Sequence, residues 1–192
     1  MTRLHLVRHG PTHAKSMVGW SDLPADLGDT AAIARLAAHL PAGAVVISSD
    51  LSRATATADA IQGPRVRLPH DRDLREMHFG SWELRTHAEI EAEDPARIRA
   101  FWERPGDTRP PGGESWHDLR SRVDGAIDRL IAAHPGRELV VVAHFGVILS
   151  QVQRALDLAP EQAFARRIDN LSVTALTRLP GGWDTGEINH RP

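Results

Sequence analysis

The length, composition and charge of the chain are those of one globular domain. Its 192 residues are 41% hydrophobic and 25% charged, with a formal net charge of −2, which gives no sign of a nucleic-acid or membrane-surface partner. Cysteine is absent, so disulfides, thiol nucleophiles and thiolate metal sites are excluded.

Membrane and secretory segments are not evident in the sequence. No apolar run is long enough to span a bilayer, and arginines and histidines interrupt the first residues, where a secretory signal would be apolar. We therefore expect a single domain over residues 1–192 that is located in the cytoplasm. We expect its partner to be a small molecule, and its state to be a monomer or homodimer.

The first half of the chain alternates predicted strands and helices. An alternating apolar segment at residues 3–7 indicates a strand, which ends in a Gly-Pro turn. A long loop separates it from residues 30–40, which carry apolar side chains on one helical face. Residues 45–48 form a short buried strand and residues 52–61 a second helix. Residues 72–85 show no period and are predicted to be irregular.

The second half continues this alternation and ends in a predicted hairpin. Residues 115–134 carry a long apolar stripe at helical spacing. Residues 139–143 are an unbroken apolar run, which is typical of a parallel strand covered on both faces. The remaining predicted elements are three helices and two hairpin strands, at residues 86–93, 95–104, 147–156, 172–178 and 183–188. The pattern predicts a three-layer α/β/α sandwich with a mostly parallel central sheet and an antiparallel edge.

Polar side chains suited to phosphate chemistry follow the predicted strands. Arg8 and His9 come after the first strand, Arg53 after the second, and His144 after the buried strand. Open α/β sheets hold their ligands at such strand ends. A guanidinium offers forked donors to phosphoryl oxygens, and a neutral imidazole can attack phosphorus. Glu76 lies among apolar neighbours, surroundings that raise a carboxyl pKa toward general-acid duty.

Five segments of the chain, in order, resemble the histidine phosphatase superfamily, whose fold is phosphoglycerate-mutase-like. They are L-V-R-H-G-x-T at 6–12, S-S-D-L-x-R-A-x-x-T-A at 48–58, L-R-E-M-x-F-G-x-W-E at 74–83, G-G-E-S at 112–115 and V-V-A-H-x-G-V at 141–147. Together they cover most of the chain. The resemblance implies a phosphomonoester hydrolase with this fold.

The resemblance also implies a catalytic role for each strand-end residue. His9 is the nucleophile that forms a phosphohistidine, and Glu76 protonates the leaving oxygen and then activates water. Arg8, Arg53 and His144 hold the phosphoryl oxygens and stabilise the charge of the transition state. His9 must be neutral at its attacking nitrogen, whereas His144 is expected to be protonated as a donor to phosphate. This set needs no metal ion and no other cofactor.

Several positions near the nucleophile bear on substrate binding. Thr12 lies within the matching motif and is expected to contact phosphate. Lys15 stands where an asparagine commonly donates to phosphate, and a lysine can serve there as a longer, flexible point charge. Pro11 replaces a common Glu, Phe145 replaces a frequent Gly, and residues 23–31 lack the usual P-L-T…Q-A signature. None of these departures removes a catalytic residue.

The leaving group is predicted from residues 76–85, which look most like the α-ribazole phosphatase branch of cobalamin assembly. The best substrate prediction is therefore α-ribazole 5′-phosphate, whose flat benzimidazole needs an apolar or aromatic wall. The candidates for that wall are Phe79, Trp82, Trp102, Trp116 and Phe145. Trp102 and Phe145 are preferred, because Trp116 lies on a core-facing helical stripe.

Other functions stay open at this stage. A phosphoglycerate mutase of this fold carries a tyrosine-bearing basic segment after the acid, and this chain has no tyrosine. A broad phosphatase, or one specific for sugar phosphates or nucleotides, fits the same motifs. A metal-dependent hydrolase is disfavoured, because the 11 histidines include no H-E-x-x-H pair. A non-catalytic binding protein would be expected to have lost the nucleophile or the acid, and both are present.

Overall fold

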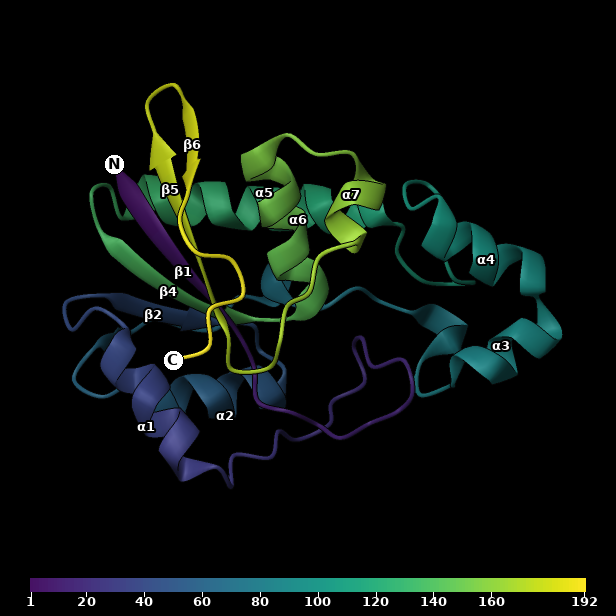
Figure 1. Ribbon diagram of the computed structural model, residues 1–192, viewed down its shortest axis with the longest axis horizontal. Coiled ribbons are helices and arrows are strands. Elements are labelled where there is room, and N and C mark those ends of the chain that lie inside the picture. The colour runs from purple at the N-terminus through teal and green to yellow at the C-terminus, as the bar shows by residue number, and fades with distance from the viewer.

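The computed structural model describes residues 1–192 and is organised around a six-stranded sheet with the order β3-β2-β4-β1-β5-β6 (Figure 1). The strands are β1 (Thr2–Arg8), β2 (Val45–Ser48), β3 (Val66–Arg67), β4 (Glu138–Ala143), β5 (Val173–Leu179) and β6 (Gly182–Thr185). The first four strands pair in parallel, whereas β5 and β6 are antiparallel. The mostly parallel sheet with an antiparallel edge is thus confirmed.

Helices cover both faces of this sheet. They are α1 (Thr30–His39), α2 (Ser52–Ile61), α3 (His87–Glu93), α4 (Pro95–Glu103), α5 (Trp116–Ala133), α6 (Phe145–Leu156) and α7 (Pro160–Phe164). In β4, Val140 and Val142 pack in a cluster with α1 and α2. Their neighbours Leu139 and Val141 pack in the larger cluster with α5 and α6. Alternate residues of one strand therefore face opposite helical layers, as a three-layer sandwich requires.

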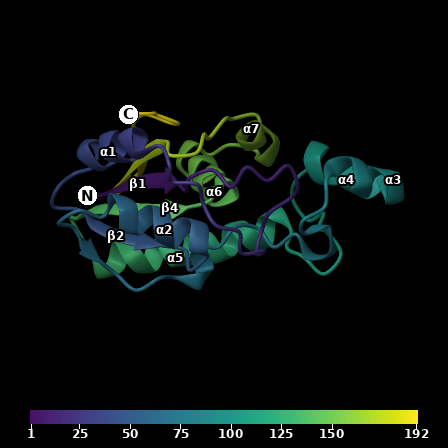
Figure 2. The same ribbon diagram turned by 90° about the horizontal axis from the view of Figure 1, so that it is seen from below.

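Helices α3 and α4 lie apart from these layers. Figure 1 shows them beyond one end of the sheet. In Figure 2, which is turned by 90°, the same two helices again protrude from that end of the molecule. Two short 3-10 helices, η1 (Arg72–Leu74) and η2 (Gly80–Trp82), occur before them in the segment predicted to be irregular. No helix in the structure combines the length and the apolar character that a membrane crossing requires.

Two elements were missed by the sequence patterns. Strand β3 has two residues, too few for an alternating pattern to be visible. Helix α7 has five residues and begins at a proline, so it contains little more than one helical turn. Helix α6 begins at Phe145, two residues before the predicted start at 147, so it follows directly on the end of β4.

The start of α5 follows the sequence prediction. The Ser115 side chain accepts a hydrogen bond from the Asp118 backbone, and the Asp118 carboxylate accepts one from the Ser115 backbone at 2.9 Å. This reciprocal capping box satisfies donors that a helix end leaves open. The apolar stripe of α5 then faces the core, which places the polar residues of the helix at its margins.

Candidate active site

A polar cavity of about 150 Å³ lies at the carboxyl ends of the parallel strands. Arg8 is the last residue of β1, His9 follows it, and Arg53 lies in the first turn of α2. The residues that line the cavity are Arg8, His9, Thr12, Ala14, Ser16, Val18, Arg53 and Glu76. The fold thus brings together four of the five residues predicted to be catalytic, and His144 lies directly beside His9.

The imidazole of His9 is oriented by its own backbone neighbour. Its Nδ1 donates to the Gly10 carbonyl oxygen at 2.6 Å. Because a carbonyl only accepts, Nδ1 carries the proton and Nε2 keeps its lone pair. Burial, together with the charge of Arg53, lowers the pKa of His9 to about 3. The ring is therefore neutral at physiological pH and can act as a nucleophile through Nε2.

The turn that carries His9 is held by two residues that were not predicted as site residues. The Gly10 backbone donates to Thr57 Oγ1 at 2.9 Å, and Asn170 Nδ2 donates to the His9 carbonyl oxygen at 2.8 Å. Thr57 falls inside the second matching segment, whereas Asn170 lies in a loop with no recognisable pattern. These contacts fix the backbone of the nucleophile from α2 on one side and from the chain before β5 on the other.

The two arginines of the cavity, Arg53 buried and Arg8 partly buried, are anchored to backbone carbonyl oxygens. Arg8 Nη1 donates to Ile168 at 2.6 Å. Arg53, which is 1% exposed, donates to Gly19 and Ser21 at 2.6 and 2.9 Å. Burial lowers the pKa of both groups and the charge of Glu76 opposes it, but a guanidinium stays protonated at neutral pH. Two fixed positive charges therefore face a small cavity, which favours a phosphoryl group.

Glu83 holds the loop that anchors Arg53. Its carboxylate accepts hydrogen bonds from the backbone N–H groups of residues 19–21, at 3.1, 2.8 and 3.1 Å. It also accepts one from Ser21 Oγ at 2.7 Å. The carbonyl oxygens of the same loop receive the Arg53 donors. Glu83 ends the third matching segment, so its position in the W-E pair was the available signal for this role.

His144 is fully buried between the nucleophile and the core. Its ring centroid is 5.1 Å from that of His9, and neither of its ring nitrogens has a hydrogen-bond partner. Burial, followed by the influence of His9 and Arg53, holds its pKa well below the usual value. This result runs against the expectation of a protonated His144. A bound phosphoryl group, with its two negative charges, would raise the pKa of His144 against burial and the nearby positive charges.

The Glu76 carboxyl lies at the start of α6. It accepts hydrogen bonds from the Met77 backbone at 2.9 Å and from the Gly146 backbone at 3.1 Å. Burial raises the pKa of Glu76, against these two hydrogen bonds and the nearby arginines. A β-carbon at position 146 would lie 2.4 Å from Glu76 Oε1, so the close approach requires glycine there. The arrangement gives the cavity a carboxyl group suited to donate a proton.

Glu76 also borders a second, apolar pocket. The pocket is lined by Glu76, Met77, Phe79, Phe101, Trp102, Trp116, Phe145, Gly146 and Phe164. Four of the five predicted wall residues are among them. Trp82 is not: it is 2% exposed and packs edge-on against Phe101 in the core. Phe101 and Phe164 were missed, since only the fold brings α4 and α7 together.

Comparisons with known proteins show the family and the fold. The family model described as "Histidine phosphatase superfamily (branch 1)" matches residues 4–191. The chain belongs to the histidine phosphatase superfamily. The fold prediction is likewise confirmed, because Bacillus stearothermophilus YhfR superposes with a TM-score of 0.90 at 29% identity, over 98% of this chain and 97% of that one.

Individual members of the superfamily differ in their named substrates. A glucosyl-3-phosphoglycerate phosphatase of Mycobacterium tuberculosis is 33% identical, over 96% of this chain and 87% of that protein. The adenosylcobalamin/alpha-ribazole phosphatase of Salmonella typhimurium is 31% identical, over 98% and 96%. The alpha-ribazole phosphatase structure from Shigella flexneri has a TM-score of 0.85 at 27% identity, over 98% and 96%. The chain spans 49% of the length of the first curated relatives it matches.

Of the two loop residues predicted to bind substrate, Thr12 and Lys15, only the first lines the cavity. Thr12 lines the cavity, and so does Ser16, which was not predicted. Lys15, between them, is exposed and does not line the cavity. The loop thus turns Ser16 toward the phosphate-sized space and Lys15 toward solvent, so a direct Lys15 contact is not part of this arrangement.

Proposed function

We propose that the protein is a phosphomonoester hydrolase that works without a metal ion through a phosphohistidine at His9. The observation that supports this most strongly is one cavity with a neutral imidazole, two anchored arginines and a carboxyl group of raised pKa. The nucleophile, the anion site and the acid therefore need no further group. Each of these side chains has a role in a two-step hydrolysis.

The first step transfers the phosphoryl group. His9 Nε2 attacks phosphorus, the bond to the ester oxygen breaks, and that oxygen leaves with the proton of Glu76. In the second step the Glu76 carboxylate takes a proton from water, and the resulting oxygen attacks the phosphohistidine. The Nε2–phosphorus bond breaks, and inorganic phosphate and neutral His9 result. Arg8 and Arg53 stabilise the equatorial oxygens throughout, with His144 as a further donor.

The apolar pocket supports α-ribazole 5′-phosphate as the substrate. Glu76 borders both the polar cavity and this pocket. When the ester oxygen lies close enough to Glu76 to receive its proton, the leaving group attached to that oxygen extends toward the aromatic side chains of the pocket. A flat benzimidazole gains from stacking there. A Salmonella relative named for this substrate is 31% identical.

A second candidate substrate is glucosyl-3-phosphoglycerate, since relatives named for it are 33% identical. Its sugar and carboxylate call for hydrogen-bond donors and cations. Apart from Glu76, however, no residue that lines the apolar pocket is charged. The pocket chemistry therefore favours the aromatic leaving group over the carbohydrate acid.

A substrate panel tests this assignment. It compares kcat/KM for α-ribazole 5′-phosphate, glucosyl-3-phosphoglycerate, 3-phosphoglycerate and ribose 5-phosphate, with and without EDTA. We expect the α-ribazole ester to lead by about tenfold or more, because the ring gains from burial of its apolar area and, in addition, roughly 0.5–1.5 kcal/mol from stacking. A higher kcat/KM for glucosyl-3-phosphoglycerate would make it the assigned substrate in place of α-ribazole 5′-phosphate. Conversion of 3-phosphoglycerate to an isomer would indicate a mutase.

Trp102→Ala is expected to affect binding of the aromatic leaving group selectively. Trp102 is 37% exposed on α4 and packs edge-on against Phe101 and Phe164, so its loss opens one wall of the pocket. We expect KM for α-ribazole 5′-phosphate to rise about tenfold, and KM for glycerol phosphate to stay within about twofold. The control is Trp183→Ala on β6, a tryptophan outside both pockets. Equal changes for both esters would contradict a leaving-group wall.

A further inference from the structure

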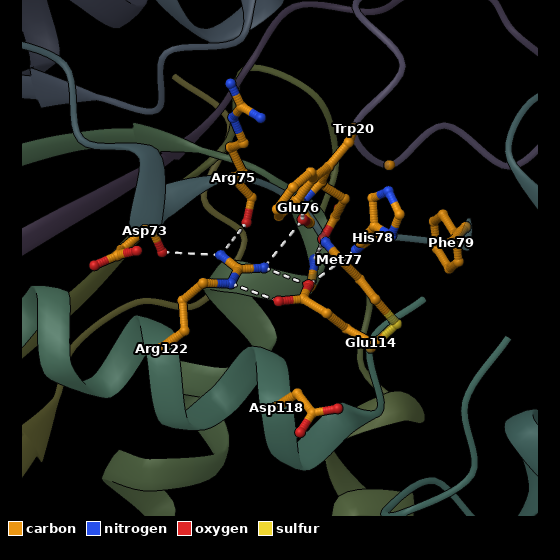
Figure 3. A network of polar contacts seen from close by, with 12 residues as sticks. Trp20, Asp73, Arg75, Glu76, Met77, His78, Phe79, Glu114, Asp118 and Arg122 are labelled. Carbon is orange, nitrogen blue, oxygen red and sulfur yellow. Dashed lines mark hydrogen bonds and ion pairs between the residues drawn. The ribbon is translucent and has the colours of Figure 1, made fainter. Parts of the chain in front are cut away.

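Arg122 of α5 binds the backbone of the segment that carries Glu76 (Figure 3). Its Nη1 donates to the carbonyl oxygens of Asp73 and Arg75, at 2.9 and 2.8 Å. Its Nη2 donates to the Glu76 carbonyl oxygen at 3.1 Å. One rigid guanidinium thus contacts three carbonyl groups of a short segment, 46 to 49 residues away along the chain.

Glu114 completes this arrangement from the other side. It pairs with Arg122 through two hydrogen bonds, Nε to Oε1 at 2.8 Å and Nη2 to Oε2 at 2.6 Å. Its Oε2 also accepts the backbone N–H of His78 at 2.9 Å. The pair therefore uses all five N–H donors of the guanidinium and holds the backbone both before and after Glu76. The two side chains are 15% and 18% exposed.

Apart from this pair, the segment is held mainly at its two ends, where Arg75 pairs with Asp50 through two hydrogen bonds of 2.7 Å and the Phe79 backbone donates to Glu83 at 3.0 Å. Residues 75–79 lie between η1 and η2 and belong to no helix or strand. The Glu76 carbonyl oxygen has only two donors, Trp20 Nε1 at 2.8 Å and Arg122. Neither Arg122 nor Glu114 lines the polar cavity or the apolar pocket. Their contacts end at the backbone of the acid and do not reach its carboxyl group.

We propose that Arg122 and Glu114 are positioning residues, which hold the Glu76 backbone so that its carboxyl group reaches the leaving oxygen. This inference rests on the proposed role of Glu76 as general acid. Proton transfer requires hydrogen-bond distance to the leaving oxygen, and a displacement of about 1 Å can cost about 10²-fold in rate. At Glu76 itself the backbone is held by the Arg122–Glu114 pair and by Trp20 Nε1, so loss of the pair should displace the acid.

The test is the phosphorylation step with two kinds of ester. Single-turnover rates are measured for 4-nitrophenyl phosphate, which needs little protonation, and for glycerol phosphate, which needs much. In Arg122→Gln and in Glu114→Gln we expect the glycerol phosphate rate to fall roughly 10- to 100-fold and the nitrophenyl rate to fall far less. The matched control is Arg154→Gln, whose side chain is 20% exposed and ion-paired with Asp128. It should leave the ratio of the two rates unchanged.

Two further measurements separate the possible outcomes. Glu76→Gln should show the same selectivity, and adding Arg122→Gln to it should change the ratio little, because both substitutions remove one function. If Arg122→Gln does not fold, Glu114→Gln, which keeps the size of the side chain, carries the test. Equal losses for both esters, or a rise in KM alone, would overturn the positioning role. If Glu76→Gln itself lacks the selectivity, the proposed acid fails and the positioning role fails with it.

Discussion

His9→Ala is expected to lower kcat for phosphate-ester hydrolysis by several orders of magnitude, as removal of a nucleophile does in other hydrolases. The imidazole is neutral, its Nδ1–H is bonded to the Gly10 carbonyl, and its ring lines a cavity that also holds Arg8 and Arg53. No other imidazole and no lysine lines that cavity. The measurement is steady-state turnover of 4-nitrophenyl phosphate, together with acid-quench trapping of labelled protein, which should detect phosphohistidine only when His9 is present.

The control for this variant is His13→Ala, four residues further along the same loop. That side chain is 68% exposed and paired with Asp26 outside the cavity, so turnover should stay near that of the unmodified protein. Near-normal activity of His9→Ala would remove the phosphohistidine from the mechanism. Complete loss of activity in EDTA, reversed by a divalent metal, would contradict the metal-independent route.

Glu76→Gln is expected to lower the rate with an alkyl phosphate by about 10² to 10⁴, the usual contribution of general acid catalysis. The glutamine keeps the size of the side chain and can still accept the Gly146 hydrogen bond, but it has no acidic proton to give. In single-turnover phosphorylation the deficit should be much smaller with 4-nitrophenyl phosphate, whose leaving group is already a weak base. Equal deficits for the two esters would point to a structural role.

The same residue determines the expected pH dependence. Burial raises the pKa of Glu76 above its ordinary value, and the first step needs the protonated form. The phosphorylation rate of an alkyl ester should therefore fall as pH rises through that pKa, whereas His9, with a pKa of about 3, stays neutral across the range. The measurement is the ratio of the rates of the unmodified protein and Glu76→Gln with the same ester at each pH. The ionisation of the substrate affects both rates equally, so it does not change this ratio. A ratio that does not change with pH would contradict the assignment.

Local patterns were sufficient for most of the fold. The run at residues 139–143 is apolar throughout, because β4 is covered by helices on both faces. The short Pro-Gly-Gly segment at 180–182, between the last two predicted strands, predicted an antiparallel edge, which β5 and β6 form. The strand-end positions of Arg8, His9 and Arg53 also followed from the sequence, because parallel strands place their carboxyl ends at one edge of the sheet.

Contacts between distant segments decided the rest. Which nitrogen of His9 is free to react depends on the orientation of the Gly10 carbonyl group, and no sequence motif specifies that orientation. The raised pKa of Glu76 comes from its burial in the folded chain, which outweighs the lowering effect of the Gly146 N–H group, 70 residues away. The apolar pocket needs α4 and α7 to meet, and Lys15 faces solvent because of the path of its loop.

The division between the two has a physical reason. Helix and strand periods repeat within a few residues, so the amino-acid sequence is enough to place the elements and the polar residues at their ends. Cavities, tautomers and pKa values arise from groups that meet only after the chain has folded. Arg122 shows this most clearly: on the sequence it is one arginine among the polar residues of a helix, and in the structure it holds the backbone of the acid.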